Sequence, residues 1–109
     1  MTFEFFSEMA RDTAKYPAIG DSIIYPTLGL AGESGEFADK IKKVFRDHGG
    51  NIDDATRYAL AYELGDILWY VSILSDEIGF ELSTIAEMNI DKLQSRKSRG
   101  KLGGSGDDR

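Results

Sequence analysis

Residues 58–75, YALAYELGDILWYVSILS, decide the fold of this chain. Apolar residues recur along the stretch at spacings of three and four, which is the period of an α-helix. One apolar stripe contains Leu60, Leu64, Ile67, Val71, Leu74 and Ile78, and a second contains Ala55, Ala59, Tyr62, Trp69 and Ile73. A helix that is apolar nearly all round belongs in the middle of a bundle or in a membrane. The stretch therefore predicts the central helix of an all-α protein.

Two acidic residues, Glu63 and Asp66, are the only charged residues inside this stretch. They are three apart, so their side chains project from the same face of the helix. The helix supplies them no basic partner, because no Lys or Arg occurs between Arg57 and Lys92. Buried charges are normally paired or bound to a metal, since an unpaired carboxylate is costly to bury. The acidic pair is therefore the main indication of a functional site.

Length and composition limit the class of protein. A chain of 109 residues forms one domain with a modest core. A net charge of −6 argues against a nucleic-acid partner and fits a protein that gathers divalent cations. The absence of Cys excludes disulfides and thiolate metal sites, and the lone His48 argues against a zinc site. The N-terminus lacks the pattern of a signal peptide, and two central acids argue against a lipid-facing helix, so we expect a cytoplasmic protein without membrane association.

The rest of the chain predicts three more helices and a tail. We expect helices over about 3–15, 27–47 and 84–97, capped by Thr2, Thr27 and Ser83 respectively. Asn51 or Asp53 caps the central helix, which ends near Ile78 with Gly79 in the left-handed position. Residues 1–99 then form one four-helix bundle. Residues 100–109 are Gly-rich and are expected to form a flexible C-terminal tail.

A second acidic pair, Glu33 and Glu36, lies on or beside the core-facing side of the helix over 27–47. Its helix is joined to the central helix by a short Gly-Gly turn, which predicts antiparallel neighbours with the two acidic pairs facing each other. At roughly 4 Å, each like-charged contact costs about 4 kcal/mol at an effective dielectric constant of about 20. A multivalent cation would offset that cost, and oxygen-only ligands favour Mg²⁺ or Mn²⁺. The simpler alternative is that Glu33 is a partly exposed acid and Glu36 pairs with Lys40.

These residues resemble a known signature. GESGE at 32–36 followed by ELGD at 63–66 resembles the ExxE…ExxD pattern of the MazG-like all-α nucleoside triphosphate pyrophosphohydrolases. YPTLGLAG at 25–32, DILWY at 66–70 and NIDKLQSR at 89–96 are similar to the surrounding blocks of that family. The resemblance covers about residues 3–102.

The resemblance implies an enzyme that cleaves a (d)NTP to a (d)NMP and pyrophosphate by water attack at the α-phosphorus. The implied ligands of Mg²⁺, or of Mn²⁺ as a substitute, are Glu33, Glu36, Glu63 and Asp66. Glu36 and Glu63 are the implied catalytic acids, with Glu36 orienting or deprotonating the water. Lys92 and Arg96 become phosphate contacts, and Asn89 a contact to metal or sugar. Phosphoryl transfer needs positioning and charge neutralisation, which metals supply.

The resemblance leaves the base and the biological role open. The resemblance favours a purine (d)NTP as the substrate. Its hydrolysis would serve either the removal of damaged nucleotides (housecleaning) or the control of a normal or viral nucleotide pool. The aromatic residues available to stack on a base are Phe6, Tyr16, Tyr25, Trp69 and Tyr70, although core packing explains each of them as well. Relatives of this length are homo-oligomers, and three partner helices cannot cover both stripes of the central helix. We therefore expect a homo-oligomer, a tetramer in preference to a dimer.

Two other functions fit the same residues. One is a non-catalytic acidic helical interaction module, whose carboxylates pair with basic groups of another protein. The other is a metal-buffering or di-iron bundle, which would need Glu-x-x-His motifs that this chain lacks. If Lys92 and Arg96 form only a solvated basic helix end, the phosphate contacts fall to the cations of the second helix, Lys40, Lys42, Lys43 and Arg46, which we place on its outer face.

Overall fold

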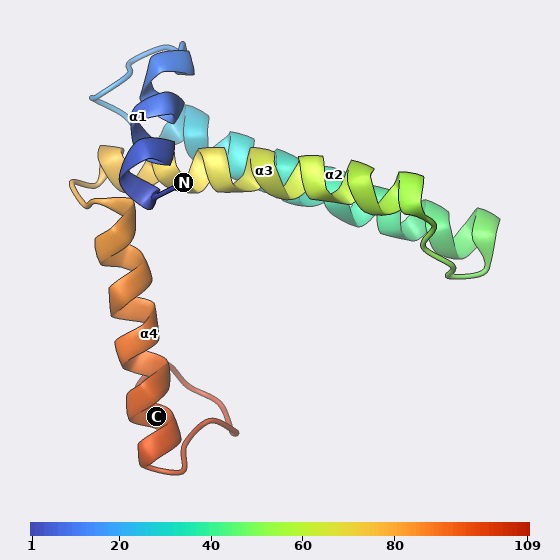
Figure 1. Cartoon of the computed structure of the whole chain (residues 1–109). Coiled ribbons are helices and arrows are strands. Elements are labelled where there is room, and N and C mark those ends of the chain that lie inside the picture. The colour runs from blue at the N-terminus through green and yellow to red at the C-terminus, as the bar shows by residue number, and fades with distance from the viewer.

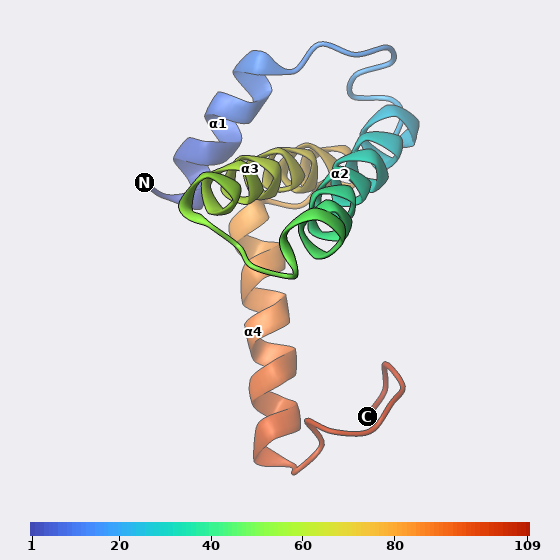
Figure 2. The ribbon, with the colours of Figure 1, turned by 90° about the vertical axis from the view of Figure 1, so that its right-hand side faces the viewer.

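A computed structural model describes residues 1–109 as four α-helices without a strand, which confirms the all-α prediction. The helices are α1 (Phe3–Thr13), α2 (Ile24–His48), α3 (Asp54–Glu77) and α4 (Leu82–Ser98). The two longest, α2 and α3, form an antiparallel hairpin, which confirms the predicted pairing (Figure 1). Near one end of the hairpin, α1 and α4 pack on different sides of α3 (Figure 2). α4 does not contact α2, so the four helices do not close into one compact bundle within a single chain.

Several predicted helix ends agree with the structure. Thr2 caps α1, because its hydroxyl accepts a hydrogen bond from the N–H of Phe5 at 3.0 Å. Asp53, rather than Asn51, caps α3 and accepts from the N–H of Thr56 at 2.8 Å. Gly79 follows α3 with φ of 83°, the left-handed conformation that glycine adopts without strain.

Two predicted caps are wrong. α2 begins at Ile24, so Thr27 lies inside the helix and Pro26 lies in its first turn. Proline fits there because the first-turn N–H groups have no intrahelical acceptor in any case. α4 begins at Leu82, which is buried, so Ser83 also lies inside the helix and Glu81 precedes it without a side-chain cap. Burial of Leu82 accounts for the earlier start, since tertiary packing outweighs a single capping bond.

The connector between α1 and α2 is anchored to the end of α3. One carboxylate oxygen of Glu77 accepts hydrogen bonds from the Tyr16 hydroxyl at 2.6 Å and from the Gly20 N–H at 2.7 Å. Tyr16 also stacks on Tyr25, with ring centroids 5.3 Å apart. Burial and the bond to Glu77 raise the pKa of Tyr16, while the bonds from Tyr16 and Gly20 lower the pKa of Glu77.

The core of one chain is small for its length. Only 10 of the 109 residues are buried, and the accessible surface is 7820 Å². A compact monomer of 12.1 kDa exposes about 6,000 Å². The radius of gyration is 16.9 Å, whereas a compact domain of this length has about 13 Å. No helix is both long enough and apolar enough to cross a membrane. The isolated chain therefore leaves apolar surface that a compact domain would cover.

The Glu77 anchor gives a prediction. Tyr16→Phe removes one hydrogen bond to Glu77, so we expect the melting temperature near neutral pH to fall by a few degrees. The lowered pKa of Glu77 means that this stability is present above its ordinary pKa of 4.5 and is lost as the pH falls through the folded-state pKa. The difference between the variant and the wild type should therefore shrink in acid. Thermal unfolding followed by circular dichroism at several pH values measures it, with the wild type as the reference.

Candidate metal centre

Three acidic side chains meet at the seam of the α2–α3 hairpin. Glu33 comes from α2, and Glu63 and Asp66 come from α3. One carboxylate oxygen of each lies within 4.8 Å of the others. Glu33 and Glu63 are half-buried and Asp66 is exposed, so the cluster opens to solvent on one side. The antiparallel pairing of the helices thus brings three of the four predicted metal ligands together.

The charges of the cluster are incompletely compensated. Burial, a hydrogen bond with Glu63 and the charge of Asp66 raise the pKa of Glu33. Lys40 lies 3.3 Å from one oxygen of Glu63, while the other oxygen of Glu63 is buried and has no hydrogen-bond partner. Leaving a buried acceptor unsatisfied is costly, and more so when it carries charge. A cation bound among the three carboxylates would supply that missing partner.

The donor set indicates which cation fits. All three groups are carboxylates, and the cluster includes no His. Hard oxygen ligands suit Mg²⁺ or Mn²⁺, and Mg²⁺ held by few carboxylates keeps waters and completes its shell with phosphate oxygens. The orphaned oxygen of Glu63 and the open side at Asp66 are compatible with such a site.

Glu36 lies outside the group of three that the structure brings together. It is exposed on α2, one turn beyond Glu33. Its charge contributes to the raised pKa of Glu33, after burial, the bond with Glu63 and the charges of the other two acids. The alternative pairing of Glu36 with Lys40 is not formed, because Lys40 crosses the seam to Glu63 instead. Lys40 was expected on the outer face of its helix, so sequence reasoning missed this contact.

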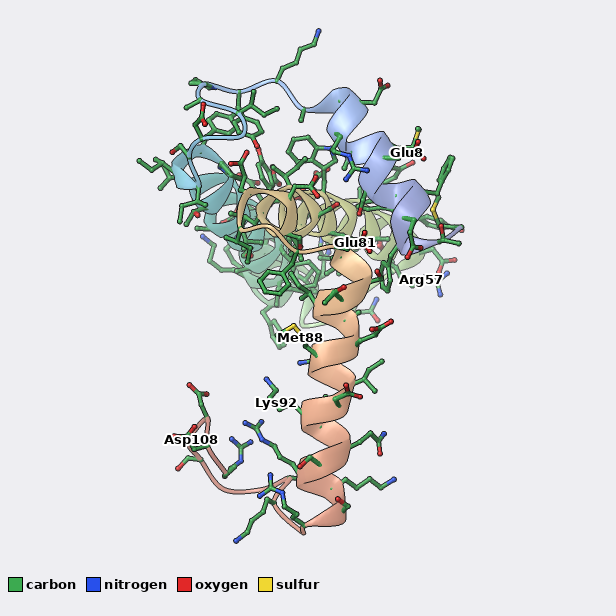
Figure 3. All side chains as sticks on the ribbon, turned by 90° about the vertical axis from the view of Figure 1, so that its left-hand side faces the viewer. Glu8, Arg57, Glu81, Met88, Lys92 and Asp108 are labelled. Carbon is green, nitrogen blue, oxygen red and sulfur yellow. The ribbon has the colours of Figure 1, made fainter.

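The predicted phosphate contacts lie on α4. Figure 3 shows Lys92 on the part of α4 that extends away from the other three helices. Arg96 is buried, and its guanidinium donates to the carbonyl of Asp107 in the tail at 2.8 Å. Asn89 is exposed on the same helix. α4 contacts α3 but not α2, and it leads away from the hairpin (Figure 3), so one chain does not bring Lys92 to the carboxylates.

A hollow borders the acids on the side of α1. It has a volume of about 300 Å³ and is lined by Thr13, Glu33, Asp66, Trp69 and Tyr70. The Trp69 N–H donates to the Thr13 hydroxyl at 2.8 Å, which fixes the indole at the rim. The Tyr70 ring lies so close to Gly29 that a Cβ at that position would overlap it. Sequence reasoning missed this requirement at Gly29, because only the packing of α2 on α3 reveals it.

The aromatic candidates separate by position. Trp69 and Tyr70 line the hollow beside the acids. Tyr16 of the connector stacks on Tyr25 at the start of α2, and Tyr25 neighbours Tyr70. Phe6 lines a different hollow with Leu68 at the N-terminus. Trp69 and Tyr70 are therefore the two candidates placed to meet a ligand held at the acids.

A metal-binding prediction follows from this geometry. Mg²⁺ should raise the melting temperature of the wild type, because binding to the folded state alone adds about 2.7 kcal/mol at 100 times the Kd. Asp66→Asn should reduce that gain, while the metal-free variant keeps or gains stability, because repulsion with Glu33 and Glu63 is relieved and no ion pair is lost. Thermal unfolding with and without Mg²⁺ measures both effects. Glu8→Gln on α1 is the control, and an equal Mg²⁺ effect in the two variants would contradict the site.

Comparison with known proteins places the chain in a family. Residues 26–100 match the MazG nucleotide pyrophosphohydrolase domain. The chain is 46% identical to the Gene 37 protein of Mycobacterium phage L5, over an alignment that covers all of both chains. No solved structure matches the chain. The match spans most of the chain and contains the acidic cluster, so this protein belongs to the MazG nucleotide pyrophosphohydrolase family.

Proposed function

We propose that this protein is a Mg²⁺-dependent nucleoside triphosphate pyrophosphohydrolase that converts a (d)NTP to a (d)NMP and pyrophosphate. The observation that supports it most is the cluster of Glu33, Glu63 and Asp66, with one buried Glu63 oxygen lacking a partner. Membership of the MazG nucleotide pyrophosphohydrolase family supports the reaction class. Mn²⁺ is the expected substitute metal, because it accepts the same oxygen ligands.

Each acid has a role in this proposal. Glu33, Glu63 and Asp66 hold the metal, and Glu36 is a further ligand at the exposed rim. A bound Mg²⁺ would neutralise charge on the phosphate oxygens and would activate the attacking water by lowering its pKa. Glu36, exposed and without an ion-pair partner in the chain, orients that water and accepts its proton. The new bond joins the water oxygen to the α-phosphorus, and the bond between that phosphorus and the bridging oxygen breaks.

The reaction itself is the first test. Wild-type protein with Mg²⁺ and a panel of (d)NTPs should release monophosphate and pyrophosphate, and Glu63→Gln or Asp66→Asn should abolish turnover. In ¹⁸O-labelled water, attack at the α-phosphorus places the label in the monophosphate. Release of orthophosphate, label in pyrophosphate, or near-normal activity of either variant would refute the proposal. The same panel tests a purine preference, which we propose from the resemblance alone.

An absence of turnover would leave the alternative of an acidic interaction module. The two roles in nucleotide metabolism, housecleaning and adjustment of a normal or viral pool, differ in the substrate they select. A modified nucleotide that is hydrolysed faster than all normal (d)NTPs would favour housecleaning.

We further propose that the active form is a homo-oligomer, a tetramer in preference to a dimer. Large apolar side chains are exposed on the hairpin, including Leu28, Tyr58 and Tyr62, and also on α4, including Met88 and Ile90. One partner covers one such face, whereas a tetramer covers two. An assembly also offers a route for Lys92 and Arg96 to reach the acids of another copy, which α4 does not do within its own chain.

Mixing of variants tests this arrangement. Light scattering at micromolar concentration should show an oligomer. Lys92→Ala should lower kcat/KM by an amount that corresponds to a loss of about 2–4 kcal/mol of transition-state stabilisation, as removal of one charge-stabilising donor does. Lys97→Ala should have little effect. If Lys92 acts on a neighbouring copy, mixing Lys92→Ala with Asp66→Asn should restore up to about a quarter of the wild-type activity in a two-fold assembly. A monomeric mass, or no recovery on mixing, would contradict the shared site.

A further inference from the structure

A separate groove lies between α2 and α3 near the turn of the hairpin. Its volume is about 330 Å³, and it is lined by Lys40, Lys43, Val44, His48, Ala55, Thr56 and Ala59. Lys40, Val44 and His48 are spaced by four, so they share one face of α2. The α3 wall is made of small side chains at Ala55, Thr56 and Ala59. This small wall leaves the groove open between two helices that pack closely elsewhere.

The ionisable side chains of the groove are all bases. Lys40, Lys43 and His48 line it and no acid does, in a chain whose net charge is −6. Lys43 and its neighbour Lys42 share a single carboxylate, that of Asp39, at 2.9 Å and 2.8 Å. Two ammonium groups on one carboxylate leave one positive charge uncompensated. The groove is therefore suited to an anion that enters from solvent.

Lys40 links the groove to the acids. Its ammonium lies 3.3 Å from Glu63, and it also lines the groove. A metal ion bound at the unpartnered oxygen of Glu63 would draw charge away from the oxygen that Lys40 contacts, and would weaken that ion pair. The ammonium group would then be free to contact an anion on the other side, in the groove.

The positions along the hairpin give the seam a direction. The aromatic hollow is lined by Thr13 of α1 together with Trp69 and Tyr70, whereas the basic groove reaches His48 and Ala55, at the ends of α2 and α3 that the turn joins. From Lys40 to His48 the rise of 1.5 Å per residue gives a length of about 12 Å. An extended ligand held at the acids therefore meets aromatic rings at one end and cations at the other.

We propose that the groove of Lys40, Lys43 and His48 binds the β- and γ-phosphates of the substrate and holds the pyrophosphate that leaves. This inference rests on the proposed function. The α-phosphate lies at the acids, and the nucleoside points toward Trp69. As the bond between the α-phosphorus and the bridging oxygen breaks, its electron pair stays on that oxygen, and charge grows on the leaving pyrophosphate. Lys40 and Lys43 stabilise that charge through charge-assisted hydrogen bonds.

The chain offers a matched pair of variants to test the groove. Lys43→Ala removes a cation that lines it, whereas Lys42→Ala removes a neighbouring cation that shares Asp39 but does not line it. Both lysines are exposed, so neither change should disturb the fold. We expect Lys43→Ala to weaken product inhibition by inorganic pyrophosphate about three- to tenfold, as for one partly exposed ionic contact, and to raise KM similarly. Lys42→Ala leaves Lys43 paired with Asp39 but keeps the ammonium that lines the groove, so its effect should be clearly smaller, and equal effects of the two variants would overturn the proposal.

His48 supplies a readout that needs no turnover. It is the only histidine, so its imidazole C–H signals in a proton NMR spectrum are assigned without ambiguity. Pyrophosphate with Mg²⁺ should shift these signals in the wild type and in Lys42→Ala, and should do so only at higher concentration in Lys43→Ala. Hydrolysis without any His48 shift would refute the groove and leave the proposed function standing. A saturable shift that depends on Lys43, in a protein that does not hydrolyse nucleotides, would refute the function and leave an anion site.

Discussion

Repulsion among carboxylates at the seam of α2 and α3 is the constraint on which the site depends. Glu33, Glu63 and Asp66 approach one another because the two longest helices pack antiparallel. The chain relieves the repulsion in two partial ways: Lys40 pairs with Glu63, and the raised pKa of Glu33 favours its neutral form. One Glu63 oxygen is still left without a partner. A fold that holds three acids in this way is prepared for a cation, because Glu33 and Glu63 are already partly desolvated before the ion arrives.

The C-terminal end of α3 anchors α1 and the connector that follows it. Ser72 donates a hydrogen bond to Ser7 at 3.1 Å between two buried hydroxyls, and Asp76 pairs with Arg11 of α1 at 3.2 Å. Glu77 binds the connector that follows α1. These contacts position α1 so that Thr13 reaches Trp69 and closes the aromatic hollow beside the acids. The same helix therefore supplies acids in its middle and anchors at its end, which couples the shape of the hollow to the stability of the fold.

The small core of one chain bears on function as well as on stability. A hairpin of two long helices exposes much of its apolar surface, and α4 leaves the hairpin without touching α2. Hydrophobic burial is the dominant favourable term in folding, and a chain that buries few residues gains little of it alone. Assembly with further copies would cover that surface, and it is also the way in which the cations of α4 could approach a set of acids.

The sequence by itself determined the helical fold, the antiparallel pairing and three acidic residues that meet at the seam. Apolar spacing and short turns are local signals, and a charged pair inside an apolar helix has few physical explanations. Only the tertiary structure decided that Lys40 turns toward Glu63, that Gly29 must lack a side chain beneath Tyr70, and that α4 stands apart from α2. It also moved the starts of α2 and α4 away from Thr27 and Ser83. These features depend on which helix faces meet and at what angle. Packing between residues distant in the chain sets both, and local sequence patterns do not encode that packing.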